Sequence, residues 1–298
     1  MKKKKKLHIS SVEKFAYVFL GLLCFTCVFP FVISLMASIT DEKSLSMNGY
    51  RLIPKEFSVE AYRILLTSYG KTLFKSLGLT ISTGLLQPII NIFLSMCMAY
   101  PLSQADFKGR NFWRIFLLIT MLFSGGMIPG YILYTRYLGM RNNIMVYLLP
   151  GLGAWNIFLY RTFFTNIDKS MVESAKIDGA NKLRIVLSIM LPLVKPLAVM
   201  NFFSGFLSRW NDITTPIYYV NNPKLYPIQY LLQSMLVGAE EMKKLIEMGL
   251  AAESEMPDIP IQSTRFALAV IGALPVFILF PYLQKYYAKG IMVGSTKG

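Results

Sequence analysis

The segment from 169 to 196 holds the densest group of residues whose spacing could serve a chemical purpose. Ser170 and Glu173, three positions apart, form a capping box and predict a helix that begins at this point. Gly179 suits the left-handed backbone that follows a helix end, and Asn181 can cap a second helix. We therefore expect a short helix, a glycine bend and a second helix.

The second of these helices is amphipathic. Its apolar residues follow the i, i+3, i+4, i+7 spacing of one helix face: Leu183, Val186, Leu187 and Met190. Pro192 is expected to close the helix. Such a stripe could pack against the rest of this chain, or it could enter a groove on a partner protein, and the spacing alone leaves both uses open.

A second polar group interrupts an otherwise apolar run at 196–220. Arg209 and Asp212, at i and i+3, could pair on one helix face as a purely structural feature. They could instead line a pathway for a sugar, since aromatic faces and hydrogen-bonding groups bind sugars. The residues that supply these groups here are Trp210, Asn211, Asp212, Tyr218 and Tyr219. Tryptophan and tyrosine also gather at membrane interfaces without any binding role.

The sequence lacks the groups that catalysis, metal binding or nucleotide binding would need. His8 is the single histidine, so no histidine-based metal site or triad can form. Cys24, Cys27 and Cys97 fall in apolar runs, where thiols behave as small apolar groups. No G-x-x-x-x-G-K-[ST] phosphate loop occurs, and no carboxylate pair or activated nucleophile stands out. We expect no enzyme activity and no cofactor in this chain.

The elements that must position these residues are membrane-spanning helices. The chain has 298 residues, of which 54% are hydrophobic and only 16% charged. A helix needs about 17–25 residues to cross a bilayer. Six charge-poor runs meet that length: 15–40, 76–105, 115–135, 142–160, 196–220 (with Arg209 and Asp212) and 266–284. The first run is too long for a signal peptide and lacks an Ala-x-Ala cleavage site. The sequence predicts an all-α membrane protein with six transmembrane helices.

Lysine and arginine set the expected orientation. With six spans both termini share one side, and that side collects Lys2 to Lys6 and most of the other basic residues, so both termini are expected to be cytoplasmic. The expected parts are a basic tail at 1–14, a permease domain at 15–288 and a cytoplasmic tail at 289–298. Within the domain we expect a cytoplasmic loop at about 165–195 and an outer loop at about 221–264.

The cytoplasmic loop carries a resemblance to a known family. Glu173-Ser174-Ala175, three residues, Gly179, nine residues and Ile189-Met190-Leu191-Pro192 resemble the EAA loop of binding-protein-dependent ABC importer permeases. Ser174 departs from the commoner alanine. The run 177–180, the triplet 210–212 and the tail 285–298 resemble the carbohydrate (maltose-type) branch, in particular its subgroup for polysaccharide or complex oligosaccharide uptake. The likeness covers nearly the whole chain.

The resemblance implies the fold of a type I ABC importer permease, in which the EAA loop is the coupling helix that docks into a cleft on a separate ATPase. The residues that it assigns to coupling are Glu173, Ser174, Ala175, Asp178, Gly179, Ile189 and Pro192. The small Ala175 and Gly179 would let the partner approach closely.

The resemblance also implies a set of partners in the bacterial plasma membrane. They are a second homologous permease subunit, two ATP-binding subunits that hold ATP and Mg, and an extracellular solute-binding protein. The chain would form half of the pathway for a carbohydrate, and the resemblance to the uptake subgroup implies an oligosaccharide.

Two other function classes account for part of the sequence. An ion-gradient-driven secondary transporter would need ionisable residues in several spans, whereas only the 196–220 run has them. The net charge of +15 could indicate nucleic acid binding. The basic residues lie at span ends, however, where anionic lipids and the positive-inside rule favour them, so we expect no nucleic acid partner.

Overall fold

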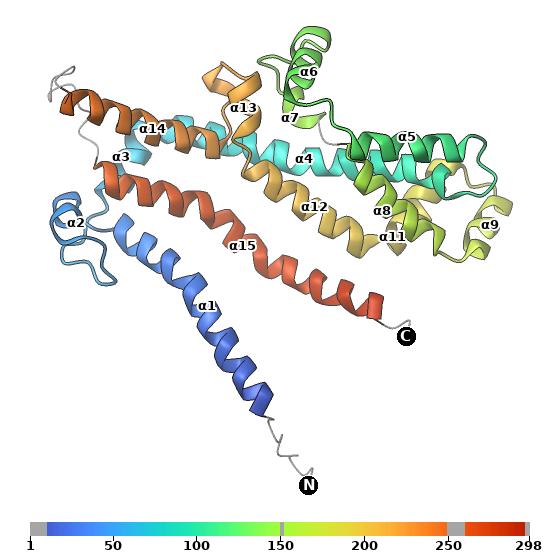
Figure 1. Ribbon diagram of the computed structural model, residues 1–298, viewed down its shortest axis with the longest axis horizontal. Helices are drawn as coiled ribbons and strands as arrows, with labels where there is room; N and C mark the ends of the chain where they lie inside the picture. The colour runs from blue at the N-terminus through green and yellow to red at the C-terminus, as the bar shows by residue number, and fades with distance from the viewer. Residues whose placement is uncertain (1–10, 150–151, 249–259, 296–298) are drawn as a thin grey trace. The chain divides into compact units, whose positions relative to one another are not determined.

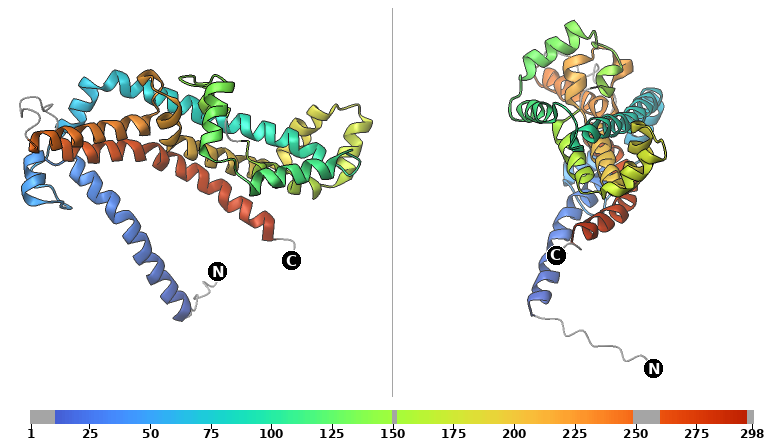
Figure 2. Two further views of the ribbon diagram at one scale, coloured as in Figure 1. Left: turned by 45° about the horizontal axis from the view of Figure 1, so that its top comes forward. Right: turned by 90° about the vertical axis from the view of Figure 1, so that its right-hand side faces the viewer.

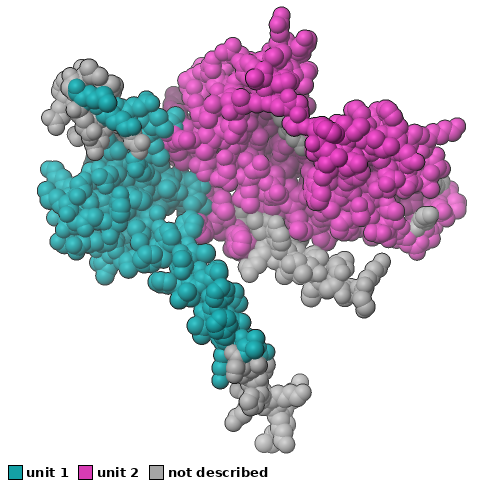
Figure 3. All heavy atoms as spheres, in the orientation of Figure 1, with its two compact units in different colours: residues 1–70, 234–274 teal, residues 71–233, 275–298 magenta. Residues whose placement is uncertain are grey.

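The computed structural model describes residues 11–149, 152–248 and 260–295. Most of the predicted basic tail with His8, residues 249–259 of the expected outer loop and the last three residues lie outside these ranges. The described residues are helical, and their strand-like pairing is an isolated bridge between Thr40 and Phe57. The chain divides into two compact units, one of residues 1–70 and 234–274 and one of residues 71–233 and 275–298 (Figure 3).

Unit 1 contains the N-terminal helices and parts of two later ones. Its helices are α1 (Ser11–Ser38), α2 (Glu42–Asn48), α3 (Glu60–Ser68), the end of α14 (Ile228–Glu247) and the beginning of α15 (Ile261–Ser295). Glu42 joins α2 to the start of α15 within this unit. Its carboxylate accepts hydrogen bonds from the Gln262 and Ser263 amides and from the Ser263 hydroxyl, each at 2.9 Å. Amides at a helix start have no partner within the helix, so Glu42 caps α15 from a segment far away in sequence.

Unit 2 contains, besides the start of α14 and the end of α15, the long helix α4 and a series of shorter elements (Figures 1 and 2). In chain order these are α4 (Gly70–Ser103), α5 (Arg110–Leu122), α6 (Met127–Ile132), the π-helical turn η1 (Leu133–Tyr137), α7 (Met145–Leu148), α8 (Ala154–Thr165), α9 (Lys169–Ile177), α10 (Lys182–Arg184), the π-helical turn η2 (Ile185–Met190), α11 (Leu191–Leu193), α12 (Lys195–Trp210), α13 (Thr214–Tyr219) and the 3-10 turn η3 (Pro223–Leu225).

The membrane-spanning prediction is confirmed in part. Among the described residues three helical stretches are long and apolar enough to span a membrane: Val12–Ser38, Gly70–Ser103 and Ile261–Ile278. Two bent pairs, Arg110–Leu122 with Met127–Tyr137 and Lys182–Leu193 with Lys195–Trp210, raise the number to five if each counts as one span. The six expected spans are therefore not confirmed as six helices.

Local breakers explain why charge-free runs do not all form single helices. In the 115–135 run Ser124, Gly125 and Gly126 separate α5 from α6, Gly126 has a φ of +86°, and the two helices meet at 111°. In the 142–160 run α7 ends at Leu148 and α8 begins at Ala154, after a glycine-rich stretch. Absence of charge indicates an apolar environment, but it does not guarantee helical continuity.

The turn before α7 is hydrogen-bonded to the end of α13 in unit 2. Asn142 has a φ of 54°, and its side-chain oxygen accepts hydrogen bonds from the Asn221 and Asn222 amides at 2.6 and 3.0 Å. Its own amide donates to the Tyr219 carbonyl at 2.9 Å. Asparagine tolerates the left-handed conformation, so one residue can turn the chain and hold the end of α13.

The crossing of α4 and α12 depends on a close backbone approach. A Cβ atom on Gly205 would lie 2.7 Å from the Pro88 Cβ, and one on Gly84 would lie 3.1 Å from the Phe206 ring. Glycine at such positions lets two helices in lipid come close enough for van der Waals contact. Because the Pro88 ring is rigid, it cannot turn aside to admit a methyl group at 205.

We predict that Gly205→Ala destabilises the packing of α4 on α12 by about 1–3 kcal/mol, the usual cost of overpacking. Gly78→Ala is the matched control, because Gly78 lies on α4 with no atom within 4 Å of an added Cβ. The thermal denaturation midpoint of the purified protein should fall for the first variant and hold for the second. Equal midpoints would show that the helices do not meet at Gly205.

Candidate functional site

The predicted helix–bend–helix segment is present, with one correction at its start. Helix α9 begins at Lys169, and its cap is Asp168 rather than Ser170: the Asp168 carboxylate accepts a hydrogen bond from the Ser170 amide at 3.0 Å. This bond, with one from the Ser170 hydroxyl, lowers the pKa of the Asp168 carboxyl. The predicted capping box of Ser170 and Glu173 is therefore wrong, because the carboxylate of Asp168, two residues before Ser170, supplies the capping acceptor.

The end of α9 follows the sequence prediction. Gly179 has a φ of +76°, and the Ala180 amide donates to the Ala175 carbonyl at 2.9 Å, the long bond of a Schellman motif. The Asn181 side chain then accepts from the Arg184 amide at 2.8 Å and caps the next helix, as expected.

Pro192 does not close the second helix, contrary to the prediction. Helical backbone continues to Leu193, and the chain bends by 88° at Val194 before α12. Ahead of the proline the helix widens into the π-helical turn η2, where the Leu191 amide bonds to the Val186 carbonyl five residues back. A proline ring presses on the carbonyl four residues earlier in a regular α-helix, and the wider turn relieves this contact.

The inner face of this segment lies in the core of unit 2. Val172, Ile185, Val186 and Met190 are buried in one cluster with residues of α4, α8 and α12, among them Tyr160. Half of the predicted apolar stripe therefore packs against the rest of the chain. Leu183 and Leu187 are 49% and 40% exposed and form the other half.

The outer face of α9 is open and ends in an exposed isoleucine. Ile177 is 86% exposed, next to the glycine bend, and Met171 is 46% exposed. Glu173 and Ser174 are exposed on the same short helix, and Asp178 is exposed directly after it. An isoleucine this open leaves its apolar side chain uncovered by the described residues of this chain.

The remaining coupling candidates divide between the two faces. Ala175 and Ile189 are half-buried and pack against the core of unit 2, so the small size of Ala175 serves that packing. Gly179 and Pro192 are exposed. Close approach by a partner is thus possible at Gly179 and Ile177 more than at Ala175.

The residues predicted to line a pathway are only partly available for that purpose. Trp210 is fully buried and stacks on Phe206 at 6.0 Å between ring centroids. Arg209 and Asp212 form an ion pair at 2.7 Å, with side chains only 14% and 9% exposed. Asp212 also accepts from the Thr215 amide at 3.0 Å and so caps α13. These contacts fit the structural alternative for the charged pair.

Aromatic rings surround this ion pair. The Arg209 guanidinium lies over the Tyr147 ring, 5.7 Å from its centroid. The Tyr147 hydroxyl donates to the Leu225 carbonyl at 2.8 Å. Tyr219 is half-buried and stacks on Tyr131 at 5.8 Å. Of the pathway candidates, only Asn211 and Tyr218 are exposed.

Sequence reasoning missed a polar cavity of about 280 Å³ formed by α4, α8 and α12. Its polar lining residues are Gln87, Asn91, Asn156, Asn201, Ser204, Ser208 and Arg209. The Asn156 amide donates to the Asn91 side-chain oxygen at 3.1 Å, and Ser95 donates to the same oxygen at 3.3 Å. Asn201, Ser204 and Ser208 recur at i, i+3 and i+7, and this polar stripe in an apolar run was the available signal.

Comparison with known proteins assigns the fold. The family of binding-protein-dependent transport system inner membrane components matches residues 64–293. A crystal structure of a bacterial ABC transporter involved in the import of the acidic polysaccharide alginate contains a chain of the same fold. It matches with a TM-score of 0.80 and 25% identity, over 96% of this chain and 99% of that one.

Curated relatives match over nearly their whole length. The polygalacturonan/rhamnogalacturonan transport system permease protein YtcP of Bacillus subtilis is 35% identical over 95% of this chain and 96% of its own. The arabinooligosaccharides transport system permease protein AraQ of Halalkalibacterium halodurans is 26% identical over the full length of both. These relatives give no support to a secondary transporter.

We predict that the Arg209–Asp212 pair stabilises unit 2. Asp212→Asn keeps an oxygen to cap α13 but leaves the Arg209 charge unpaired, and breaking a buried pair costs about 3–5 kcal/mol. The denaturation midpoint of the purified protein should therefore fall for Asp212→Asn. It should recover in the neutral double variant Arg209→Gln/Asp212→Asn, and lack of recovery would mean that the pair is not the stabilising contact.

Proposed function

Because this chain belongs to the family of binding-protein-dependent transport system inner membrane components, we propose that it is one of two permease subunits of a carbohydrate importer driven by a separate ATPase. The observation that carries the proposal is the two-faced coupling segment at 169–193, buried on its inner side and open on its outer side. ATP and Mg are held by the partner ATPase, and no catalytic role is proposed for this chain.

The outer face of α9 supports docking on the ATPase. Ile177 offers an apolar anchor, and Glu173, Ser174 and Asp178 surround it with polar groups, the usual anatomy of a protein contact. Gly179 and Pro192 flank this surface, while Ala175 and Ile189 fix it to the core. Movement of the docked loop would reach α12 through the same buried cluster.

The polar cavity supports a carbohydrate pathway better than the residues first expected. Its amide and hydroxyl groups can both donate and accept, as sugar hydroxyls require. Ser204 and Ser208 are exposed on α12, so the cavity is open at its surface. Asn211 and Tyr218 remain candidates for a second contact zone, whereas the burial of Trp210 argues against direct contact with substrate.

The nature of the relatives supports an oligosaccharide as the substrate. YtcP, AraQ and the alginate importer are named for polysaccharide or oligosaccharide transport. The proposed assembly adds a second homologous permease, two ATP-binding subunits and an extracellular solute-binding protein. Its place is the bacterial plasma membrane, with the basic termini and the 165–195 loop in the cytoplasm and the 221–264 loop outside.

We predict that Ile177→Glu prevents the substrate from stimulating ATP hydrolysis. The side chain is 86% exposed, so folding should be unaffected, whereas a carboxylate buried in the docked interface would weaken docking by about 2 kcal/mol or more. Substrate-stimulated ATPase activity of the reconstituted transporter should fall by at least about tenfold.

Ile177→Leu is the control, since it keeps the apolar volume and should retain activity. A cysteine at 177, in a background where Cys24, Cys27 and Cys97 are serine, should crosslink to the ATPase, whereas a cysteine at the exposed Met47 should not. Full activity of Ile177→Glu together with no crosslink would refute the docking role.

We predict that Ser204→Leu lowers oligosaccharide uptake by about tenfold, because the larger side chain obstructs the cavity and removes a hydrogen-bonding group. Ser204→Ala removes only the hydroxyl and should cost about twofold to threefold. Uptake is measured in vesicles at matched levels of assembled transporter. If Ser204→Leu transports at the native rate, the substrate does not pass this cavity.

A further inference from the structure

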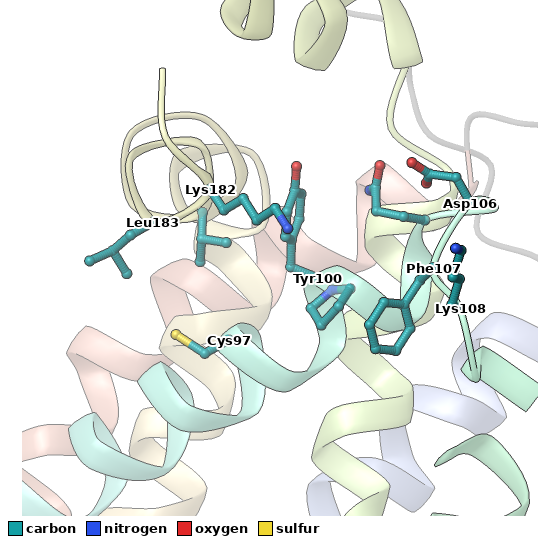
Figure 4. A pocket seen from close by; sticks show the side chains of 10 residues that line it. Cys97, Tyr100, Asp106, Phe107, Lys108, Lys182 and Leu183 are labelled. Carbon is teal, nitrogen blue, oxygen red and sulfur yellow. The ribbon is translucent and has the colours of Figure 1, made fainter. Parts of the chain in front are cut away.

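A second cavity, of about 620 Å³, lies in unit 2 between the end of α4 and α10, where the second helix of the 169–193 segment begins. Figure 4 shows its walls: Lys182 and Leu183 come from α10 on one side, and Asp106, Phe107 and Lys108 come from the loop after α4 on the other. The docking surface on α9 and the amide-lined cavity use none of these five residues.

The lining of this cavity is divided into a polar part and an apolar part. Lys108 and Lys182 supply two ammonium groups, and Tyr100 and Gln104 add neutral hydrogen-bond donors. Asp106 is the one carboxylate among the described lining residues, so the cavity carries a net positive charge. The apolar part consists of Cys97, Pro101, Phe107, Leu183 and Val186.

Further arginines raise the positive potential nearby. Arg110 and Arg114 are close enough to Arg161 to lower the pKa of its guanidinium, after the larger effect of its burial. Arg161 is held in place by donating to the Leu102 carbonyl at the end of α4, at 3.0 Å. A local excess of fixed positive charge attracts anions and raises their concentration at the cavity.

The position of the cavity along α4 also matters. It lies at the end of α4, a helix long and apolar enough to span a membrane. The 34 residues of α4 exceed the length that the hydrocarbon core needs, so the end of the helix is long enough to reach the lipid headgroups. This step rests on the proposed function, which puts this end on the cytoplasmic side, where basic pockets between helices bind anionic headgroups. A phospholipid has the matching division, with a charged phosphate joined to an apolar tail.

We propose that this cavity binds the phosphate headgroup of an anionic phospholipid. Lys108 and Lys182 pair with the phosphate, Tyr100 and Gln104 donate hydrogen bonds to its oxygens, and the first acyl carbons lie against Phe107 and Leu183. Because Lys182 and Leu183 belong to the coupling segment and Lys108 belongs to the loop after α4, the bound lipid bridges the two and steadies the loop.

The test measures lipid retention, which does not depend on transport. The purified transporter is incubated with phosphatidylglycerol or phosphatidylcholine, and the lipid that remains bound is counted by native mass spectrometry. The native protein should retain phosphatidylglycerol in preference to phosphatidylcholine. The double variant Lys108→Gln/Lys182→Gln should bind phosphatidylglycerol about 25-fold more weakly, since each lysine near an anionic headgroup contributes about fivefold.

Lys195→Gln is the matched control, because it removes one exposed charge from the neighbouring helix start outside the cavity and should retain the lipid. Excess inorganic phosphate should not displace phosphatidylglycerol, and displacement would reassign the cavity to a soluble phosphate. Equal retention by the double variant and the control, or no retention by the native protein, would overturn the proposal.

Discussion

The burial of the inner face of the coupling segment in the core of unit 2 is the interaction on which the account depends. Val172, Ile185, Val186 and Met190 share one cluster with α4, α8 and α12. Close-packed interiors transmit displacement instead of absorbing it. A force applied to α9 from outside is therefore passed to α12, the helix that carries Asn201, Ser204 and Ser208.

A second constraint is the cost of polar groups in an apolar environment. A charge at the centre of a membrane helix costs about 2.5–3.5 kcal/mol, so it must be paired or face a cavity. Arg209 and Asp212 meet this constraint with an ion pair, while the amides of Asn91 and Asn156 meet it with each other. The charged pair thus serves the fold, and in the proposed function the neutral amides would contact the hydroxyl groups of a carbohydrate.

Features formed by residues close together in the chain could be predicted from the sequence, whereas features that bring distant residues together could not. Gly179 and Asn181 act through backbone within a few residues, so their roles follow from residue type and spacing. The break at Gly125 and Gly126 was concealed because apolar run length says nothing of continuity. The amide-lined cavity joins residues from three helices far apart in sequence, and the burial of Trp210 depends on its stacking with Phe206. Both the cavity and the burial of Trp210 result from tertiary packing.

The rigid connection between the coupling loop and α12 can be measured directly. Spin labels at Ile177 and Ser208, both exposed in unit 2, report the distance between them in the assembled transporter, without nucleotide and with ADP trapped by vanadate. We predict that this distance stays constant while the distance from Ser208 to the partner permease changes. A change within the chain as large as the change between the subunits would contradict the account.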